Sequence, residues 1–258
     1  MDNNSPWLIF DETRNYHNAK MRLFCFHYAG AGASIFQNWI KLLPDEVELV
    51  AIQLPGREKR FHEPLISDVR QITTALANEL PPFLDKPFAF FGHSIGALIG
   101  FDLARVLRQR EMRQPELLIA SGRNAPQVKL EVNNVHLLPD DEFAQTVRDY
   151  NGMPEAIAQN EELLELLLPR LRSDIAIAET YTYNSEEPLD CRIVVFYGTE
   201  DPLVNDFGLQ NWKEQTNGGV ELDSFPGDHF FLHSAEKSVL DKICAELKQL
   251  LLCSRASA

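Results

Sequence analysis

One short segment of the sequence holds a serine in a setting that would make it reactive. Gly92-His93-Ser94-Ile95-Gly96 joins an apolar run to a helix-length segment. A sharp strand-to-helix turn needs glycine at both ends of this motif, because bulkier side chains would collide with neighbouring backbone. The serine hydroxyl would then stand at a helix N-terminus, where free N–H groups and the helix dipole favour developing negative charge. The pattern predicts that Ser94 is a nucleophile.

A serine nucleophile needs a base, and the base needs an acid that orients it. Asp201 follows the apolar run 191–198 in the turn YGTEDPLV, and His229 follows the run 220–225 in FPGDHFFLH. The chain order Ser, Asp, His is that of the α/β-hydrolases. The sequence therefore predicts a catalytic triad of Ser94, Asp201 and His229.

Other acids and histidines lie close to these positions. Glu200 and Asp206 are alternatives to Asp201, which is preferred because it directly precedes proline in a tight turn. Asp228 is expected either to begin a helix or to support the site from outside it.

His233 follows His229 by four residues, a spacing that resembles a metal-binding pair. No third ligand is spaced to complete a zinc site, so no metal is predicted. His93 lies inside the turn and is expected to pack behind the site.

A tetrahedral intermediate also needs hydrogen-bond donors for its oxyanion. One predicted donor is the backbone N–H of Ile95, which directly follows the nucleophile. The other should come from the turn HYAGAG at residues 27–32, where small side chains let the backbone approach the site.

Strands and helices alternate along most of the chain and would place these residues together. Because most strand positions are apolar, the pattern predicts a mostly parallel sheet covered by helices on both faces. All three triad candidates then fall at the carboxyl edge of the sheet. Strands are predicted at 21–26, 47–54, 87–92, 115–122, 191–198 and 220–225, and helices at 34–43 (capped by Ser34), 66–83, 95–110 and 234–252.

The region 122–187 breaks this alternation. It contains no strand candidate, and the segments 140–150 and 160–183 have the pattern of helices. A structureless loop of such length is improbable. We therefore expect a helical insertion at about 122–187 within a single domain that spans 1–258.

Composition excludes several classes of protein. The 258 residues are 45% hydrophobic and 24% charged, with a formal net charge of −14. An acidic chain repels nucleic acid, and no apolar run approaches the roughly 18–20 residues of a membrane span.

The four cysteines form no C-x-x-C pair, and Cys25 and Cys191 lie in or beside strand candidates. With no signal-peptide pattern at the N-terminus, free thiols and a cytoplasmic location are expected.

Several segments, read in order, resemble one family of enzymes. They are FCFHYAGAGAS, IQLPGREKR, FFGHSIGALIGFDLAR, FYGTEDPLV and GDHFFLH. Together they resemble the type II (editing) thioesterases, stand-alone α/β-hydrolases that accompany non-ribosomal peptide and polyketide synthases. The resemblance extends from Met21 to Leu250. The LPGRE turn and the HFFL context are much more specific than G-x-S-x-G, which all α/β-hydrolases share.

The resemblance implies hydrolysis of acyl or aminoacyl thioesters from phosphopantetheine arms, which rescues stalled synthases. It implies Ser94 as nucleophile, Asp201 as orienting acid and His229 as base. The N–H groups of Ala29 and Ile95 would form the oxyanion hole, and the helical insertion would be a lid. No cofactor is expected apart from the phosphopantetheine of the substrate. The expected partner is an acyl- or peptidyl-carrier protein domain, and the expected oligomeric state is a monomer.

Two positions depart from the pattern of this family. His27 stands where the family commonly has proline, and Asp228 where it commonly has glycine. The first departure would shift the oxyanion turn, and the second places an extra acid beside His229.

Carrier proteins are often acidic, so a chain of −14 is expected to dock them through a local basic patch. Arg57, Lys59 and Arg60 follow a predicted strand end at the active-site edge and are the candidates for this patch.

Three other functions stay open at the level of sequence. A medium-chain thioesterase of a fatty acid synthase shares the fold and the motifs. A small-molecule carboxylesterase would share the triad but prefer oxygen esters. A non-catalytic module that binds a carrier domain is the alternative from a different class. The acyl group and the synthase served are not encoded in any motif.

Overall fold

The computed structural model describes the chain except for residues 1–4, 12–13, 15, 130–133, 150–160 and 257–258. The described residues form a seven-stranded sheet in the order β1-β3-β2-β4-β5-β6-β7, in which only β1 runs antiparallel to its neighbour. The predicted mostly parallel sheet is confirmed. The strands are β1 (Leu8–Phe10), β2 (Met21–Phe26), β3 (Val47–Ile52), β4 (Phe88–His93), β5 (Leu117–Ser121), β6 (Arg192–Gly198) and β7 (Val220–Phe225).

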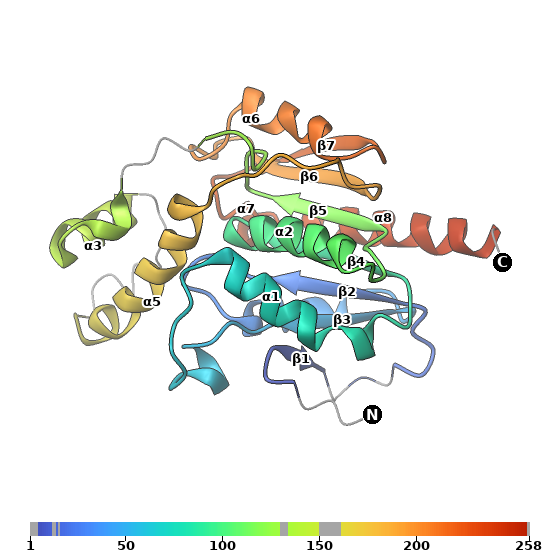
Figure 1. Ribbon diagram of the computed structural model, residues 1–258, viewed down its shortest axis with the longest axis horizontal. Helices are drawn as coiled ribbons and strands as arrows, with labels where there is room; N and C mark the ends of the chain where they lie inside the picture. Colours follow the sequence, from blue (N-terminus) through green and yellow to red (C-terminus); the bar gives the residue numbers. More distant parts are fainter. Residues whose placement is uncertain (1–4, 12–13, 15, 130–133, 150–160, 257–258) are drawn as a thin grey trace.

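Helices cover both faces of the sheet (Figure 1). Successive strand residues point to opposite faces, so each strand feeds two apolar cores. Phe24 and Phe90 pack on the side of α1 (Val69–Glu79) and α2 (Ile95–Gln109). Cys25 and Phe91 pack on the other side, with the C-terminal helix. The remaining elements here are α6 (Asp206–Gln210), α7 (Phe231–Ser234), α8 (Glu236–Ala256), η3 (Glu58–Arg60), η4 (Pro81–Phe83) and η6 (Asn211–Gln215).

The six predicted strands correspond to β2–β7, and the predicted helices 66–83, 95–110 and 234–252 contain α1, α2 and most of α8. Asp68 caps α1 by accepting a hydrogen bond from the N–H of Gln71 at 3.0 Å. None of the described helices combines the length and apolarity that crossing a membrane requires.

The predicted helix 34–43 is wrong. This segment forms two short 3₁₀ turns, η1 (Ala33–Phe36) and η2 (Trp39–Lys41). Ser34 is not a helix cap, because its N–H and hydroxyl both donate to Oε1 of Glu58, at 3.1 and 2.7 Å. A contact with a distant turn replaces the local hydrogen bonds of an α-helix here.

The described residues between β5 and β6 include several helical segments. These are η5 (Val135–Leu137), α3 (Asp140–Asp149) and α5 (Glu161–Thr180), and no strand lies among the described residues of this insertion. Residues 150 and 160 of the predicted helices lie outside the described residues. In Figure 1, α3 and α5 stand beyond the ends of the strands, to one side of the sheet.

Candidate active site

Ser94 occupies a strained turn between β4 and α2. Its backbone has φ 56° and ψ −115°, in the left-handed region that residues with a side chain rarely adopt. A Cβ atom on Gly92 would lie 2.2 Å from the carbonyl oxygen of Gly96, and one on Gly96 would lie 2.3 Å from that of Phe26. The predicted steric need for both glycines is confirmed. The N–H of Ser94 donates to the carbonyl of Ser121 at 2.8 Å, which fixes the turn against β5.

His229 and Asp201 form a buried hydrogen-bonded pair. Nδ1 of His229 lies 2.8 Å from Oδ2 of Asp201, and Oδ1 of the same carboxylate accepts from the N–H of Leu203 at 2.9 Å. Both side chains are buried. The carboxylate therefore holds the imidazole in one orientation, in which Nδ1 is protonated and Nε2 is left for a substrate or the nucleophile.

Gly198 lets the two loops that carry this pair come together. A Cβ atom on Gly198 would lie 2.4 Å from the carbonyl oxygen of Asp228. The N–H of Glu200 donates to Gly227 at 2.9 Å across the same contact. The side chains of Glu200 and Asp206, the alternative acids, are exposed instead.

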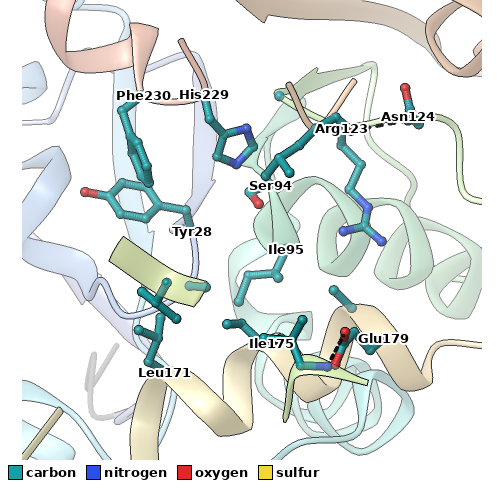
Figure 2. Close-up of a pocket in the computed structure, with 16 residues that line it drawn as sticks. Tyr28, Ser94, Ile95, Arg123, Asn124, Leu171, Ile175, Glu179, His229 and Phe230 are labelled. Atoms are coloured by element: carbon teal, nitrogen blue, oxygen red, sulfur yellow. Dashed lines mark hydrogen bonds between the residues drawn. The ribbon is translucent and has the colours of Figure 1, made fainter. Parts of the chain in front are cut away.

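Ser94 and His229 line one pocket of about 210 Å³ (Figure 2). Tyr28 and Phe230 form the wall on one side, and helix α5 forms another wall. Most of the lining is apolar. The other lining residues are Ala29, Ile95, Gly122, Arg123, Asn124, Val135, Val147, Leu171, Ile175, Ala178, Glu179 and Leu203.

The two predicted oxyanion donors, Ala29 and Ile95, belong to this lining. The next residue along the first turn, Gly30, has φ 79°, and its N–H donates to Oδ2 of Asp174 at 2.7 Å. A side chain of α5 thus holds the backbone beside Ala29.

Arg57 and Asp174 form a buried ion pair behind this turn. The two guanidinium NH groups of Arg57 donate to the two carboxylate oxygens of Asp174 at 2.7 and 2.8 Å. Arg57 also donates to the carbonyl of Ala31 at 2.9 Å. Glu58 contacts the same turn, since its Oε1 would lie 2.1 Å from a Cβ atom on Gly32. The LPGRE segment therefore holds the turn at residues 27–32 in place.

The predicted docking patch is wrong for two of its three residues. Arg57 is buried in the ion pair just described. Arg60 is also buried, because it pairs with Glu63 at 2.6 Å and stacks over the ring of Trp7 at 4.2 Å. Lys59 alone is exposed. Partners distant in the sequence hold both side chains inside the protein: Asp174 pairs with Arg57, and Trp7 stacks on Arg60. Neither guanidinium is therefore exposed to a carrier protein.

The remaining histidines have separate partners. His93 is buried with Nδ1 2.8 Å from Oγ of Ser121, and its ring centre lies 5.0 Å from that of His229. Burial holds the pKa of His93 well below its ordinary value, so a neutral ring packs against the base. His233 does not join His229 in a metal site, because its Nε2 lies 2.8 Å from the hydroxyl of Tyr28.

The two departures from the family pattern also have physical roles. Asp228 precedes α7, and its Oδ1 accepts from the N–H of Phe230 at 2.8 Å, as expected of an acid that begins a helix. His27 is buried with Nδ1 2.9 Å from the carbonyl of Tyr28, and burial lowers its pKa to about 4.

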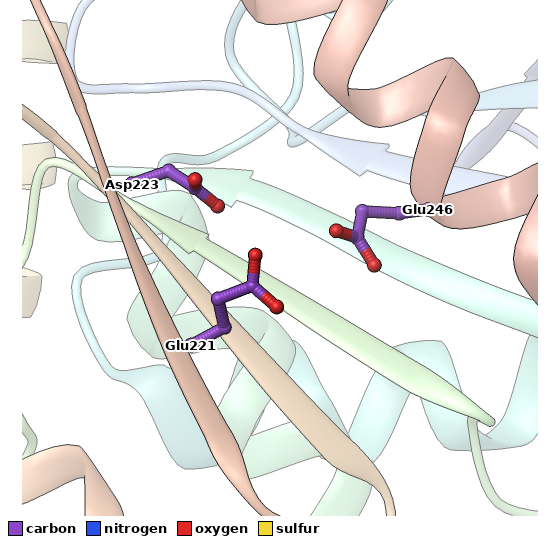
Figure 3. A group of neighbouring side chains, drawn as sticks. All are labelled: Glu221, Asp223 and Glu246. Carbon is purple, nitrogen blue, oxygen red and sulfur yellow. The ribbon is translucent and has the colours of Figure 1, made fainter.

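An acidic cluster lies away from the pocket, on β7 and α8. Figure 3 shows the carboxylates of Glu221, Asp223 and Glu246 facing one another. Nζ of Lys242 forms ion pairs with Glu221, Asp223 and Glu246 at 2.6, 3.2 and 3.0 Å, and Arg192 pairs with Glu221 and Glu246. These cations neutralise the cluster, which ties the C-terminal helix to the edge of the sheet.

Two residues of the site were missed at the level of sequence. Asp174 is a lone acid in the apolar run DIAIA, and such an acid in a buried helix face signals a charged partner elsewhere in the chain. Arg123 follows β5 and lines the pocket. Its only signal was its place just after a predicted strand end.

Comparisons with known proteins agree with this geometry. Residues 21–247 match the Thioesterase domain family. The Gramicidin S biosynthesis protein GrsT of Aneurinibacillus migulanus is 44% identical over 90% of this chain and 91% of its own length. The structure of the type II thioesterase BorB from the borrelidin biosynthetic cluster superposes with a TM-score of 0.83 at 32% identity, over 93% of this chain and 97% of that one.

A more distant relative is the medium-chain S-acyl fatty acid synthase thioesterase of Rattus norvegicus, 30% identical over 90% of this chain and 91% of its own length. The strained serine, the buried His–Asp pair and the family match lead to one assignment. The chain belongs to the thioesterase family and is a thioester hydrolase.

Proposed function

We propose that the protein is an editing thioesterase that removes acyl or aminoacyl groups from the phosphopantetheine arms of carrier proteins. The observation that carries the proposal is that His229, held by its hydrogen bond to Asp201, lines the same pocket as Ser94. The relatives named for gramicidin S and borrelidin biosynthesis support a role beside a peptide or polyketide synthase.

In the proposed mechanism, Ser94 Oγ attacks the thioester carbonyl while Nε2 of His229 takes the hydroxyl proton. The tetrahedral intermediate collapses, the C–S bond breaks, and the protonated His229 returns its proton to the departing phosphopantetheine thiol. A water molecule, deprotonated by His229, then hydrolyses the acyl-enzyme and frees Ser94. Asp201 keeps the imidazole oriented through both steps. The proposal needs no cofactor other than the arm that the substrate carries.

Developing negative charge on the carbonyl oxygen would be stabilised by the N–H groups of Ala29 and Ile95. Each such donor is typically worth about 3–4 kcal/mol in the transition state. The described part of the insertion would act as a lid, because Leu171 and Ile175 of α5 lie in the same lining as Ser94. The carrier protein would approach this end of the molecule, and Lys59 is the exposed remnant of the basic patch expected there.

The second candidate function is release of medium-chain fatty acids, which the similarity to the rat enzyme favours. Carrier proteins loaded with acetyl, aminoacyl and acyl chains of increasing length separate the two. Slow hydrolysis of many short groups supports editing, whereas one sharp optimum at medium chain length supports product release. Labelling of the wild-type protein but not Ser94→Ala by a fluorophosphonate tests the nucleophile independently.

A further inference from the structure

Arg123 places a positive charge in an otherwise largely apolar pocket. It follows Gly122, whose φ of 61° turns the chain over the site at the end of β5. Figure 2 shows its guanidinium on the opposite side of Ser94 from Tyr28 and Phe230. Within the described residues, its side chain forms no ion pair and donates no hydrogen bond to a protein acceptor. The side chain is half-buried where it lines the pocket, and guanidinium groups in such apolar surroundings commonly pair with a carboxylate, so an unpaired one stands out.

The nearby acid of the pocket does not neutralise Arg123. Glu179 lines the same pocket, but its carboxylate accepts from the N–H groups of Val135 and His136, both at 2.9 Å, and from Nδ1 of His136. Glu179 therefore holds η5 in place. The cost of desolvating Arg123 is visible in its pKa, which burial lowers to about 10.

Hydrogen bonds fix the backbone around Arg123, and this fixed backbone holds the side chain in the pocket. Its carbonyl accepts a hydrogen bond from Nε1 of the buried Trp212 at 2.9 Å. The N–H of Ala125 donates to Gly208 at 2.9 Å two residues later. Side-chain substitutions at Arg123 leave both anchors intact.

We propose that Arg123 makes the pocket selective for acyl groups that carry a carboxylate, such as half-thioesters of dicarboxylic acids. This deepens the proposed editing function and rests on it. A planar guanidinium recognises a carboxylate through two parallel hydrogen bonds, and the apolar surroundings strengthen the pairing. The phosphate of the arm is a poorer occupant, because the whole pantetheine chain separates it from the thioester sulfur beside Ser94.

The test compares malonyl, succinyl and glutaryl N-acetylcysteamine thioesters with neutral acyl thioesters of equal chain length. For at least one length, the wild type should hydrolyse the carboxylated substrate with the higher kcat/KM. In Arg123→Met this ratio of carboxylated to neutral kcat/KM should fall about 100-fold, the scale for losing one partner of a desolvated charge pair. Arg123→Lys should keep part of the ratio. Arg113→Met, an exposed arginine before β5, is the matched control and should keep all of it.

Three results overturn the proposal: no preference for a carboxylate in the wild type, a preference that survives Arg123→Met, or an equal loss on both substrates. The same neutral acyl groups are also presented on phosphopantetheine. A loss in Arg123→Met confined to these phosphate-bearing substrates would also overturn the proposal and assign Arg123 to the arm. Hydrolysis of neutral carrier-bound groups reports on the editing function separately. If that activity is present and the ratio is flat, only the selectivity fails, and if it is absent, both proposals fail.

Discussion

Asp174 of helix α5 and Arg57 of the LPGRE turn form a buried bidentate ion pair, although 117 positions separate them in the sequence. The same carboxylate accepts the N–H of Gly30 at 2.7 Å, beside the proposed oxyanion donor Ala29. One carboxylate therefore joins the helical insertion to the backbone that faces Ser94. Any movement of this part of α5 is coupled to the geometry of the turn at residues 27–32.

Replacing Asp174 by Ala should destabilise the protein by about 3–5 kcal/mol, because it leaves the buried Arg57 without a counter-charge. The free energy of unfolding in urea measures this. Asp140→Ala is the control, since Asp140 pairs with Arg172 but its side chain is 82% exposed, and it should cost less than about 1 kcal/mol. Equal destabilisation by both substitutions would show that the buried ion pair contributes no more to the free energy of unfolding than the exposed one.

Asp174→Asn should also lower kcat more than KM, because the turn would lose its charged acceptor while the pocket keeps its shape. Steady-state kinetics with one acyl-loaded carrier protein give the two constants. A change confined to KM would contradict a role in positioning the oxyanion turn.

Asp201→Asn should reduce kcat by about 10⁴, the loss seen for the same change in another serine hydrolase triad. The reason is that an amide cannot hold the His229 tautomer that exposes Nε2 to the pocket. Glu200→Gln changes the neighbouring exposed acid and should leave kcat within about twofold of wild type. A comparable loss in both variants would mean that the acid has been assigned to the wrong residue.

Gly96→Ala and Gly100→Ala lie one turn apart in α2 and should act in opposite directions. A methyl group on Gly96 would lie 2.3 Å from a backbone oxygen, whereas one on Gly100 would have its nearest neighbours at 3.5–3.6 Å. The first should destabilise by at least about 2 kcal/mol. The second should stabilise by about 0.5–1 kcal/mol through helix propensity. Thermal unfolding of both variants decides this, and a stable Gly96→Ala would contradict the close packing of the turn between β4 and α2.

Stability should fall as the pH drops below 6.5, in part because of His27. Burial lowers the pKa of His27 from 6.5 to about 4, so between these values the unfolded chain binds more protons than the folded one. Between pH 6.5 and 5.0, the contribution of His27 to stability should fall by about 1.5 kcal/mol. His27→Asn should flatten the pH dependence by this amount, whereas substitution of the exposed His62 should not. Parallel curves for wild type and His27→Asn would refute the assignment.

The sheet and the positions of the triad candidates could be predicted from the sequence because they depend on local patterns. Each of the three triad candidates follows an apolar run that forms a strand, and parallel strands bring their carboxyl ends to one edge of the sheet. Strand β1 was missed because its three residues carry too little pattern. The prediction of a helix at 34–43 was wrong because Ser34 donates its hydrogen bonds to Glu58, which is distant in the sequence and invisible to a local pattern.

The charged residues show where such prediction ends. Arg57 and Arg60 look like a surface patch in the sequence, since charge is visible there and burial is not. Their inward position depends on Asp174 and on the ring of Trp7, both distant in the chain. Arg123 was missed for the converse reason, because only the folded pocket shows that a charged side chain lacks a partner.

The most direct test of the central claim is the release of acyl groups from a loaded carrier protein, followed by intact-protein mass spectrometry for wild type and Ser94→Ala. The wild type should return the carrier to its free thiol form. Ser94→Ala should be slower by about 10⁵–10⁶ in kcat, the loss found on removing the nucleophile of a comparable triad. Release at the wild-type rate by Ser94→Ala would contradict the account.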